Sequence, residues 1–268
     1  MRATTKLLCV SLMVFLCSSA SSSERAAEGL KVLGGLAVRL PLQEIAKLYE
    51  RETGARVEVV IGPPAALVAQ MAKERSGDVF IPGSRYGLGL AREKGLVGRS
   101  AGETIAYLVP CIAVPAGNPK GIHSLRDLTR PGVRVGVRSD AEGPEKPCLD
   151  DVAKAAFAAA GVTRQVEANI AARLDKCEQT AAAIREGRVD AVVTWSFFAA
   201  RFPKEIEALS FPEARANYRA IPAAPTTCAA DPEAARRFLE LLVSPQGQAA
   251  FARYGYAPRT SKPPRARG

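Results

Sequence analysis

Two glycine-containing turns, residues 34–37 and 62–65, have the composition of an anion-binding site. Each follows a short apolar run and precedes an amphipathic stretch. A strand that passes through such a turn into a helix directs free backbone N–H groups and the positive end of the helix dipole toward the turn, which favours an anion. Neither turn contains Lys and no GxxxxGK[ST] pattern occurs, which excludes the phosphate loop of a nucleotidase. A purely structural role for both turns is the alternative.

Other side chains that could do chemistry are few. His123 is the only histidine, so neither a His-rich metal site nor a Ser-His-Asp triad with a second histidine can be built. No pair of carboxylates is placed for acid–base work. We therefore predict a protein that is not an enzyme and has no cofactor. Arg39 and Arg85, which follow the first turn and a third turn at 82–84, could supply a cation to an anion.

Strand and helix patterns alternate along the chain and must position these turns. The predicted strands are 31–33, 56–61, 78–81, 105–114, 133–137, 166–170, 190–194 and a return strand within 211–221. The predicted helices are 39–54, 66–75, 125–128, 149–160, 179–188 and 232–242. This alternation is typical of α/β lobes, each a mostly parallel sheet with flanking helices. Such sheets bind ligands at the carboxyl ends of their strands.

The two ends of the chain are predicted to lie outside the folded part. Residues 1–20 have the basic start, short apolar run and small-residue cleavage site of a secretory signal peptide. Cys17 leaves a lipoprotein anchor as an alternative. Residues 258–268, rich in Arg and Pro, are predicted to be a basic disordered tail. The remaining positive charge of this +10 chain is scattered among the helices, which argues against binding of nucleic acid.

Short motifs recur in a fixed order after the predicted signal. They comprise the first two turns and residues 77–81, 93–97, 113–119, 125–128, 231–248 and 254–256. This ordered set covers nearly the whole mature chain and resembles the periplasmic molybdate-binding proteins of ABC transporters, which are the substrate-binding components of molybdate/tungstate importers. The resemblance implies a type II periplasmic binding protein fold with two lobes, two crossover strands and hinge closure. It implies residues 30–107 plus 222–257 for lobe 1 and 108–221 for lobe 2.

The resemblance also implies a ligand site made of backbone N–H groups at helix starts, two serine hydroxyls and a tyrosine hydroxyl. The serine positions fall at Ala37 and Pro64, which have no hydroxyl, and Pro64 has no N–H either. The tyrosine position falls at Trp195, which keeps one donor in its indole N–H, with core packing as the alternative. The predicted ligand-binding residues are Gly35, Leu36, Ala37, Ala65, Cys148, Leu149, Cys177 and Trp195.

Cys111, Cys148, Cys177 and Cys228 remain once the predicted signal is removed. An even number of cysteines in an oxidising compartment favours two disulfides. The resemblance places Cys148 and Cys177 at two helix starts that face one ligand, and we favour a disulfide between them. The alternative is a metal site in which Cys111, Cys148 and Cys177 bind a soft metal or a metalloid such as arsenite.

These patterns and the resemblance together predict a monomeric periplasmic solute-binding protein of an ABC importer. It would bind a small oxyanion similar to molybdate or tungstate in a cleft between the lobes. Its partners would be an inner-membrane permease and the ATPase of that permease. The alternative is a protein that binds a soft metal or metalloid through the cleft cysteines, as a transporter or sensor subunit. The loss of both serine positions leaves the identity of the ligand open.

Overall fold

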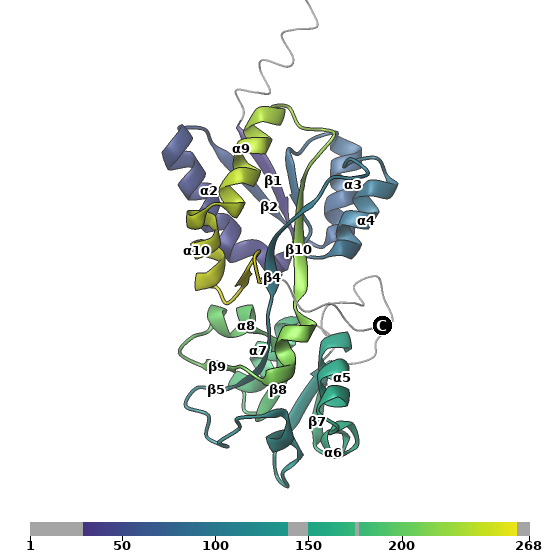
Figure 1. The fold of residues 1–268 in the computed structure, drawn as a ribbon, viewed down its shortest axis with the longest axis vertical. Helices are drawn as coiled ribbons and strands as arrows, with labels where there is room; N and C mark the ends of the chain where they lie inside the picture. The colour runs from purple at the N-terminus through teal and green to yellow at the C-terminus, as the bar shows by residue number, and fades with distance from the viewer. Residues whose placement is uncertain (1–28, 139–149, 175–176, 262–268) are drawn as a thin grey trace, which may run out of the picture.

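The structure, a computed structural model, describes residues 29–138, 150–174 and 177–261. These residues form two α/β lobes that lie end to end along the long axis of the molecule (Figure 1). The strands of lobe 1 are β1 (Leu30–Gly34), β2 (Val57–Ile61), β3 (Val79–Ile81), β4 (Glu103–Leu108), β10 (Arg219–Pro225) and β11 (Ala257–Pro258). The strands of lobe 2 are β5 (Pro110–Pro115), β6 (Val135–Arg138), β7 (Ile170–Leu174), β8 (Ala191–Trp195) and β9 (Ile206–Leu209).

Helices flank both sheets. Lobe 1 contains η1 (Leu36–Val38), α2 (Arg39–Thr53), α3 (Pro64–Glu74), α4 (Arg85–Glu93), α9 (Pro232–Val243) and α10 (Pro245–Arg253). Lobe 2 contains η2 (Leu125–Thr129), α5 (Asp150–Ala159), α6 (Thr163–Glu167), α7 (Cys177–Arg185), α8 (Ser196–Arg201) and η3 (Pro212–Asn217). Within the described residues, no helix has the length and apolar character needed to cross a membrane.

The two sheets confirm the predicted fold class, but each sheet is mixed rather than mostly parallel. The strand order is β11-β4-β10-β3-β1-β2 in lobe 1 and β7-β6-β8-β5-β9 in lobe 2. β1 runs parallel to β2 and β3, and β6 runs parallel to β7 and β8. The crossover strands β5 and β10 run antiparallel to their neighbours, because each enters its sheet from the opposite lobe. β4, which leaves lobe 1, is antiparallel to β10 and β11.

The chain passes between the lobes twice. It leaves lobe 1 through Val109, the single residue between β4 and β5, and returns after β9 and η3 into β10. The end of the lobe 2 strand β8 lies at this crossing, because Trp195 is paired with Pro110 at the start of β5. Since β6 and β7 are parallel to β8, the carboxyl ends of all three strands face lobe 1.

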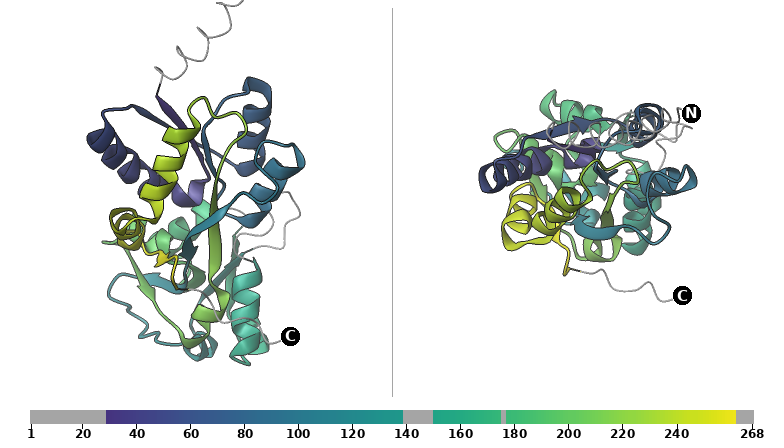
Figure 2. Two further views of the ribbon diagram at one scale, coloured as in Figure 1. Left: turned by 45° about the horizontal axis from the view of Figure 1, so that its top comes forward. Right: turned by 90° about the horizontal axis from the view of Figure 1, so that it is seen from above.

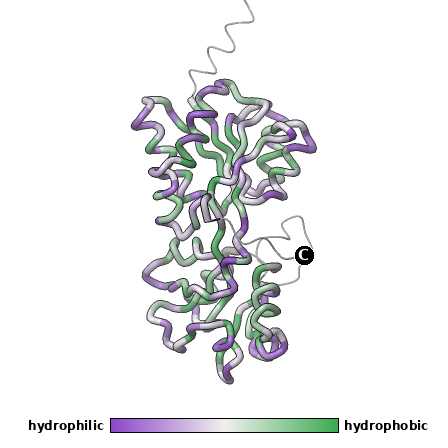
Figure 3. The backbone as a smooth tube through the Cα atoms, viewed as in Figure 1, coloured by the Kyte–Doolittle hydropathy of each residue, from purple (hydrophilic) through white to green (hydrophobic). Residues whose placement is uncertain are grey.

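Apolar helix faces cover both sides of the lobe 1 sheet. Leu42, Ile45 and Tyr49 of α2 are buried against Phe238 of α9, where the Tyr49 and Phe238 rings meet edge to face at 5.4 Å. Helices α3 and α4 cover the opposite face, where Met71 is buried. The two helical layers are visible on either side of the sheet in Figures 1 and 2. Hydrophobic segments follow the strands inside both lobes, and hydrophilic segments lie at the outer turns (Figure 3).

One predicted strand is wrong. Residues 166–170 were expected to be extended, but α6 ends at Glu167 and β7 begins only at Ile170. Val162 and Val166 are both buried four residues apart, which is the spacing of a helix face rather than of a strand. The sequence reading also missed α4, α8, α10 and the short strands β9 and β11.

Ordered structure extends beyond the predicted start of the C-terminal tail. Pro258 lies in β11 and pairs with β4. The N–H of Arg259 donates to the side-chain oxygen of Gln248 at 2.9 Å. Residues 262–268 of the predicted tail, and the predicted signal peptide 1–20, lie outside the described residues.

Candidate ligand site at the lobe boundary

The turns that follow β1, β2 and β3 are joined by backbone hydrogen bonds. The N–H of Gly35 donates to the carbonyl of Ile81 at 2.9 Å, and the N–H of Gly62 donates to the carbonyl of Gly34 at 3.1 Å. These contacts fix the carboxyl ends of the three strands against one another. The three helix starts that follow them therefore share one edge of the lobe 1 sheet.

Close approaches between the turns require glycine. A Cβ atom on Gly35 would lie 2.4 Å from the carbonyl oxygen of Pro82, which is shorter than any normal contact. A Cβ atom on Gly87, in the first turn of α4, would lie 2.5 Å from the Cβ of Pro82 and 2.8 Å from the Cβ of Pro64. The structure thus packs the turn after β3 directly against the turns after β1 and β2.

Four backbone N–H groups at this edge are left over by helix geometry. In the first turn, Val38 makes the first helical bond, to Gly35 at 3.1 Å, so the N–H groups of Leu36 and Ala37 have no acceptor within η1. In α3 the first bond runs from Leu67 to Pro63, at 3.0 Å. The N–H groups of Ala65 and Ala66, which precede Leu67, therefore have no acceptor within α3, and both residues are exposed. We call these four N–H groups, of Leu36, Ala37, Ala65 and Ala66, the edge amides.

The structure brings together Gly35, Leu36, Ala37 and Ala65, four of the residues predicted to bind ligand. Cys148 and Leu149 lie outside the described residues. Cys177 begins α7, which follows the carboxyl end of β7, and its side chain is not described. The contribution of lobe 2 to the ligand site therefore stays a prediction.

Ser84 is a polar residue at the same edge that the sequence reading did not single out. Its half-buried hydroxyl accepts a hydrogen bond from the N–H of Gly87 at 3.3 Å and caps α4. The hydroxyl keeps its own proton as a donor. A serine between a Pro-Gly turn and a helix is a typical N-cap, and this signal was present in the sequence.

Trp195 belongs to the core at the lobe boundary. Its side chain is 1% exposed and belongs to a hydrophobic cluster that also contains Phe197, Phe198 and Val152 from lobe 2 and Leu108 from lobe 1. This packing matches the alternative given for Trp195 above. The use of its indole N–H on a ligand stays a prediction.

The two described cysteines, Cys111 and Cys228, form no disulfide. Cys111 packs in lobe 2 against Leu174 and Val192, and Cys228 packs against a cluster in lobe 1. Because both of these cysteines are free, the expectation of two disulfides is wrong. A bridge between Cys148 and Cys177 stays a prediction.

The position of Cys111 favours a packing role over metal binding. Burial raises the pKa of its thiol to about 12, so the thiolate that would bind a metal is disfavoured. Among the described residues, no group of three or more His, Cys, Asp or Glu side chains is placed to hold a metal ion.

A small cavity adjoins the edge amides where the lobes meet. It measures about 10 Å³ and is lined by Leu36, Ala37, Arg39, Leu40, Phe197, Arg201, Tyr254 and Tyr256. The hydroxyl of Tyr256 donates to the carbonyl of Ala37 and so holds the first turn in place. Burial raises the pKa of Tyr256, and the charge of Arg201 opposes that shift only in part, so the phenol stays a neutral donor.

Two α/β lobes joined by two crossings, with helix starts gathered at their boundary, define a bilobed binding protein. Residues 30–257 match the family of bacterial extracellular solute-binding proteins, and the chain belongs to this family. The prediction that the protein is not an enzyme is confirmed at the level of the family, whose members bind solutes.

Several relatives cover most of the chain at low identity. A protein of Haemophilus influenzae that carries only a general binding-protein description is 25% identical over 94% of this chain and 98% of its own length. The molybdate-binding protein ModA of Mycobacterium bovis is 22% identical over 90% of this chain and 88% of its own. The structure of L-phospholactate-bound PEB3 from Campylobacter jejuni has a TM-score of 0.71 and 22% identity, and covers 85% of this chain and 99% of that one. This last likeness shows the shared fold.

Proposed function

We propose that this protein captures a small oxyanion between its lobes and delivers it to an ABC importer. The observation that carries the proposal is the set of edge amides, which four residues from two helix starts present at the carboxyl edge of lobe 1. Helix starts are suited to anions because free N–H groups and the positive end of the helix dipole act together.

The surroundings favour an anion over a cation or a neutral solute. Arg39 follows the first turn and Arg85 opens α4, and both lie beside the edge. The chain carries a formal net charge of +10, which raises the local concentration of small anions. The ModA relative is named as a molybdate-binding protein, which supports an oxyanion as the class of ligand.

The edge offers fewer hydroxyl donors than the molybdate-binding proteins that the sequence resembles. Ala37 and Pro64 stand where those proteins have serines, and a missing charge-assisted hydrogen bond costs about 1.5–3 kcal/mol. We therefore rank molybdate and tungstate as members of the ligand class rather than as its only members. Ser84 supplies one hydroxyl at the edge.

The periplasm is the proposed location, and an inner-membrane permease with its ATPase the proposed partner. Both follow from the predicted signal peptide at residues 1–20 and from the family, whose members are extracellular solute-binding proteins.

Calorimetric titration of the mature protein tests the proposal. Molybdate, tungstate, sulfate, phosphate and arsenite are compared, the last with reduced protein. We expect at least one tetrahedral oxyanion to bind and arsenite to bind no better than phosphate. Tight binding of arsenite alone, lost on oxidation, would replace the oxyanion with the thiol site.

An added hydroxyl locates the site within the same experiment. Ala37→Ser restores a donor at the first turn and should raise the affinity for the oxyanion about tenfold, as one charge-assisted hydrogen bond implies. Ala55→Ser adds the same hydroxyl at an exposed position after α2 and serves as the control. Equal effects of the two substitutions would remove the first turn from the site.

A further inference from the structure

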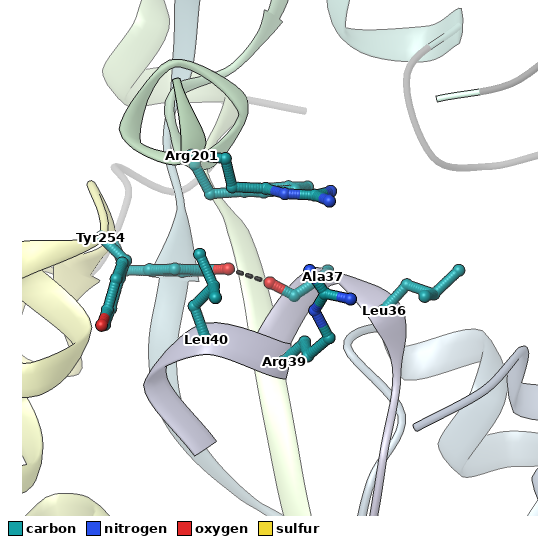
Figure 4. Close-up of a pocket in the computed structure, with 8 residues that line it drawn as sticks. Leu36, Ala37, Arg39, Leu40, Arg201 and Tyr254 are labelled. Carbon is teal, nitrogen blue, oxygen red and sulfur yellow. Dashed lines mark hydrogen bonds between the residues drawn. The ribbon is translucent and has the colours of Figure 1, made fainter. Parts of the chain in front are cut away.

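Arg39 and Arg201 approach the same small cavity from opposite lobes. Arg39 begins α2 in lobe 1, and Arg201 ends α8 in lobe 2. Both residues are half-buried and line the cavity of about 10 Å³ beside Ala37. Figure 4 shows the side chain of Arg201 extending over Arg39 and Ala37.

Neither arginine forms an ion pair with a described residue. The ion pairs of this structure engage other arginines, for example Arg253, which pairs with Glu44 of α2. Arg201 contacts the ring of Phe202, with 5.6 Å between its guanidinium carbon and the ring centroid. The residues that line the cavity include two cations and no carboxylate. Two like charges on partly buried residues thus face a common space with no counter-ion among the residues that the structure describes.

An oxyanion group is the ligand that this arrangement fits. Guanidinium groups bind carboxylate and phosphate oxygens with paired N–H donors, and these charge-assisted bonds are about twice as strong as neutral ones. The cavity has room for about one water-sized group, since a water needs roughly 10–15 Å³. It therefore admits one oxygen of a terminal carboxylate or phosphate group rather than a complete molecule.

The cavity adjoins two of the edge amides, because Leu36 and Ala37 also line the cavity. Leu36 is 52% exposed, so it offers an apolar surface beside the cavity. We infer that the solute is an organic anion with two charged ends. One oxyanion end binds the edge amides, and a carboxylate or phosphate end lies between Arg39 and Arg201. This inference rests on the function proposed above and specifies its class of solute.

The two arginines also give such a solute a means of closing the lobes. A group held by one cation from each lobe gains its second contact only when the lobes come together. Closure is then favoured by the differential affinity of the solute for the closed arrangement.

Titration of the mature protein with L-phospholactate, phosphonoacetate, succinate, inorganic phosphate and molybdate tests the inference. We expect at least one two-ended anion to bind about tenfold or more tightly than inorganic phosphate. Arg201→Gln and Arg39→Gln should each weaken binding of that anion about 10- to 100-fold, the range expected for a charge-assisted hydrogen bond. Arg201→Gln should leave the affinity for inorganic phosphate within about threefold, since a single oxyanion needs only the amides.

Two further measurements distinguish direct binding of one anionic group by both arginines from a general effect of positive charge on anion affinity. The double variant should lose less than the product of the two single losses, because both arginines hold one group. Arg164→Gln in α6 removes the same charge at an exposed position of lobe 2 and should change neither affinity. The melting temperature of each unliganded variant should not fall, because one of two repelling charges is gone.

The possible outcomes are distinct. If phosphate or molybdate binds and no two-ended anion binds more tightly, the inference is wrong and the proposed function stands. If Arg201→Gln weakened the binding of phosphate as much as that of the two-ended anion, the arginines would bind a free inorganic ion. That result would also overturn the inference. If no anion binds at all, both the inference and the proposed function fail.

Discussion

The hydroxyl of Ser196 donates a hydrogen bond to the carbonyl of Gly255. Ser196 is the first residue of α8 in lobe 2, and Gly255 lies between α10 and β11 in lobe 1. The contact therefore joins the two lobes directly at their boundary, beside the cavity that Tyr256 lines.

Ser196→Ala should lower the affinity for the bound oxyanion about 2- to 10-fold. One neutral hydrogen bond contributes about 0.5–1.5 kcal/mol, and here it stabilises only the arrangement in which the lobes meet. Calorimetry measures the effect. Ser76→Ala is the control, because the hydroxyl of Ser76 contacts Lys31 and Glu74 within lobe 1. An unchanged affinity in Ser196→Ala would mean that the contact does not contribute to the ligand-bound form.

Two glycine substitutions should have opposite effects on stability. Gly35→Ala places a Cβ 2.4 Å from the backbone of Pro82 and should lower the free energy of unfolding by about 1–3 kcal/mol, as overpacking does. Gly89→Ala in α4 meets nothing within 4 Å and should raise it by about 0.5–1 kcal/mol. Urea unfolding measures both. A stable Gly35→Ala variant with full oxyanion affinity would show that the turns need no close approach.

The ion pair between Arg134 and Asp190 should make lobe 2 sensitive to acid. Burial raises the pKa of Asp190, but the hydrogen bonds and charge of Arg134 outweigh it and hold that pKa below its usual value. A carboxylate with a lowered folded pKa contributes its full stability above its unfolded pKa of about 3.9. That contribution is lost as the pH falls below this value through the folded pKa.

Asp190→Asn should therefore lower the free energy of unfolding at pH 7 by about 1–2 kcal/mol, the range for a bond to a charged group with a half-exposed partner. It should also flatten the decline of stability below about pH 4. Urea unfolding at a series of pH values tests this, with Glu186→Gln, an exposed carboxylate of the same lobe, as control. If the free energy of unfolding declined equally below about pH 4 in the wild type and in Asp190→Asn, the ion pair would not be the source of the acid sensitivity.

The cysteines should differ sharply in reactivity. Cys111 is 2% exposed and its pKa is raised to about 12, so it should react with a thiol reagent only after unfolding, whereas the half-buried Cys228 reacts in the native protein. Unreduced, unfolded mature protein should show two thiols if Cys148 and Cys177 are bridged. Four thiols would show that they are not. Native labelling of Cys111 as fast as Cys228 would contradict its burial.

The sequence was sufficient for the lobes and for the first two turns because those signals are local. Gly35, Ala37 and Ala65 follow apolar strands and precede amphipathic helices, and this local order alone predicts a shared sheet edge. The predicted helix 232–242 is likewise local, since Asp231 directly before it caps α9 by accepting from the N–H groups of Glu233 and Ala234.

The cavity between Arg39 and Arg201 could not be predicted in this way. The two arginines are 162 positions apart in the numbering of the chain, and they line one cavity only because the crossings bring the two lobes together. The burial of Cys111 could not be predicted either, because the sequence of a crossover strand does not show on which face of the sheet a side chain lies. Its burial in lobe 2 follows from the pairing of β5 between β8 and β9.

The most direct test of oxyanion capture at the lobe boundary is an amide NMR titration of the ¹⁵N-labelled mature protein with molybdate and with phosphate. We predict that the signals of the edge amides, from Leu36, Ala37, Ala65 and Ala66, shift most, because an N–H that donates to an anion is deshielded. The amides of Gly95 and Gly161, at distant helix ends, should stay unchanged. Shifts that cluster away from the edge amides, while these four signals remain in place, would contradict the proposed site.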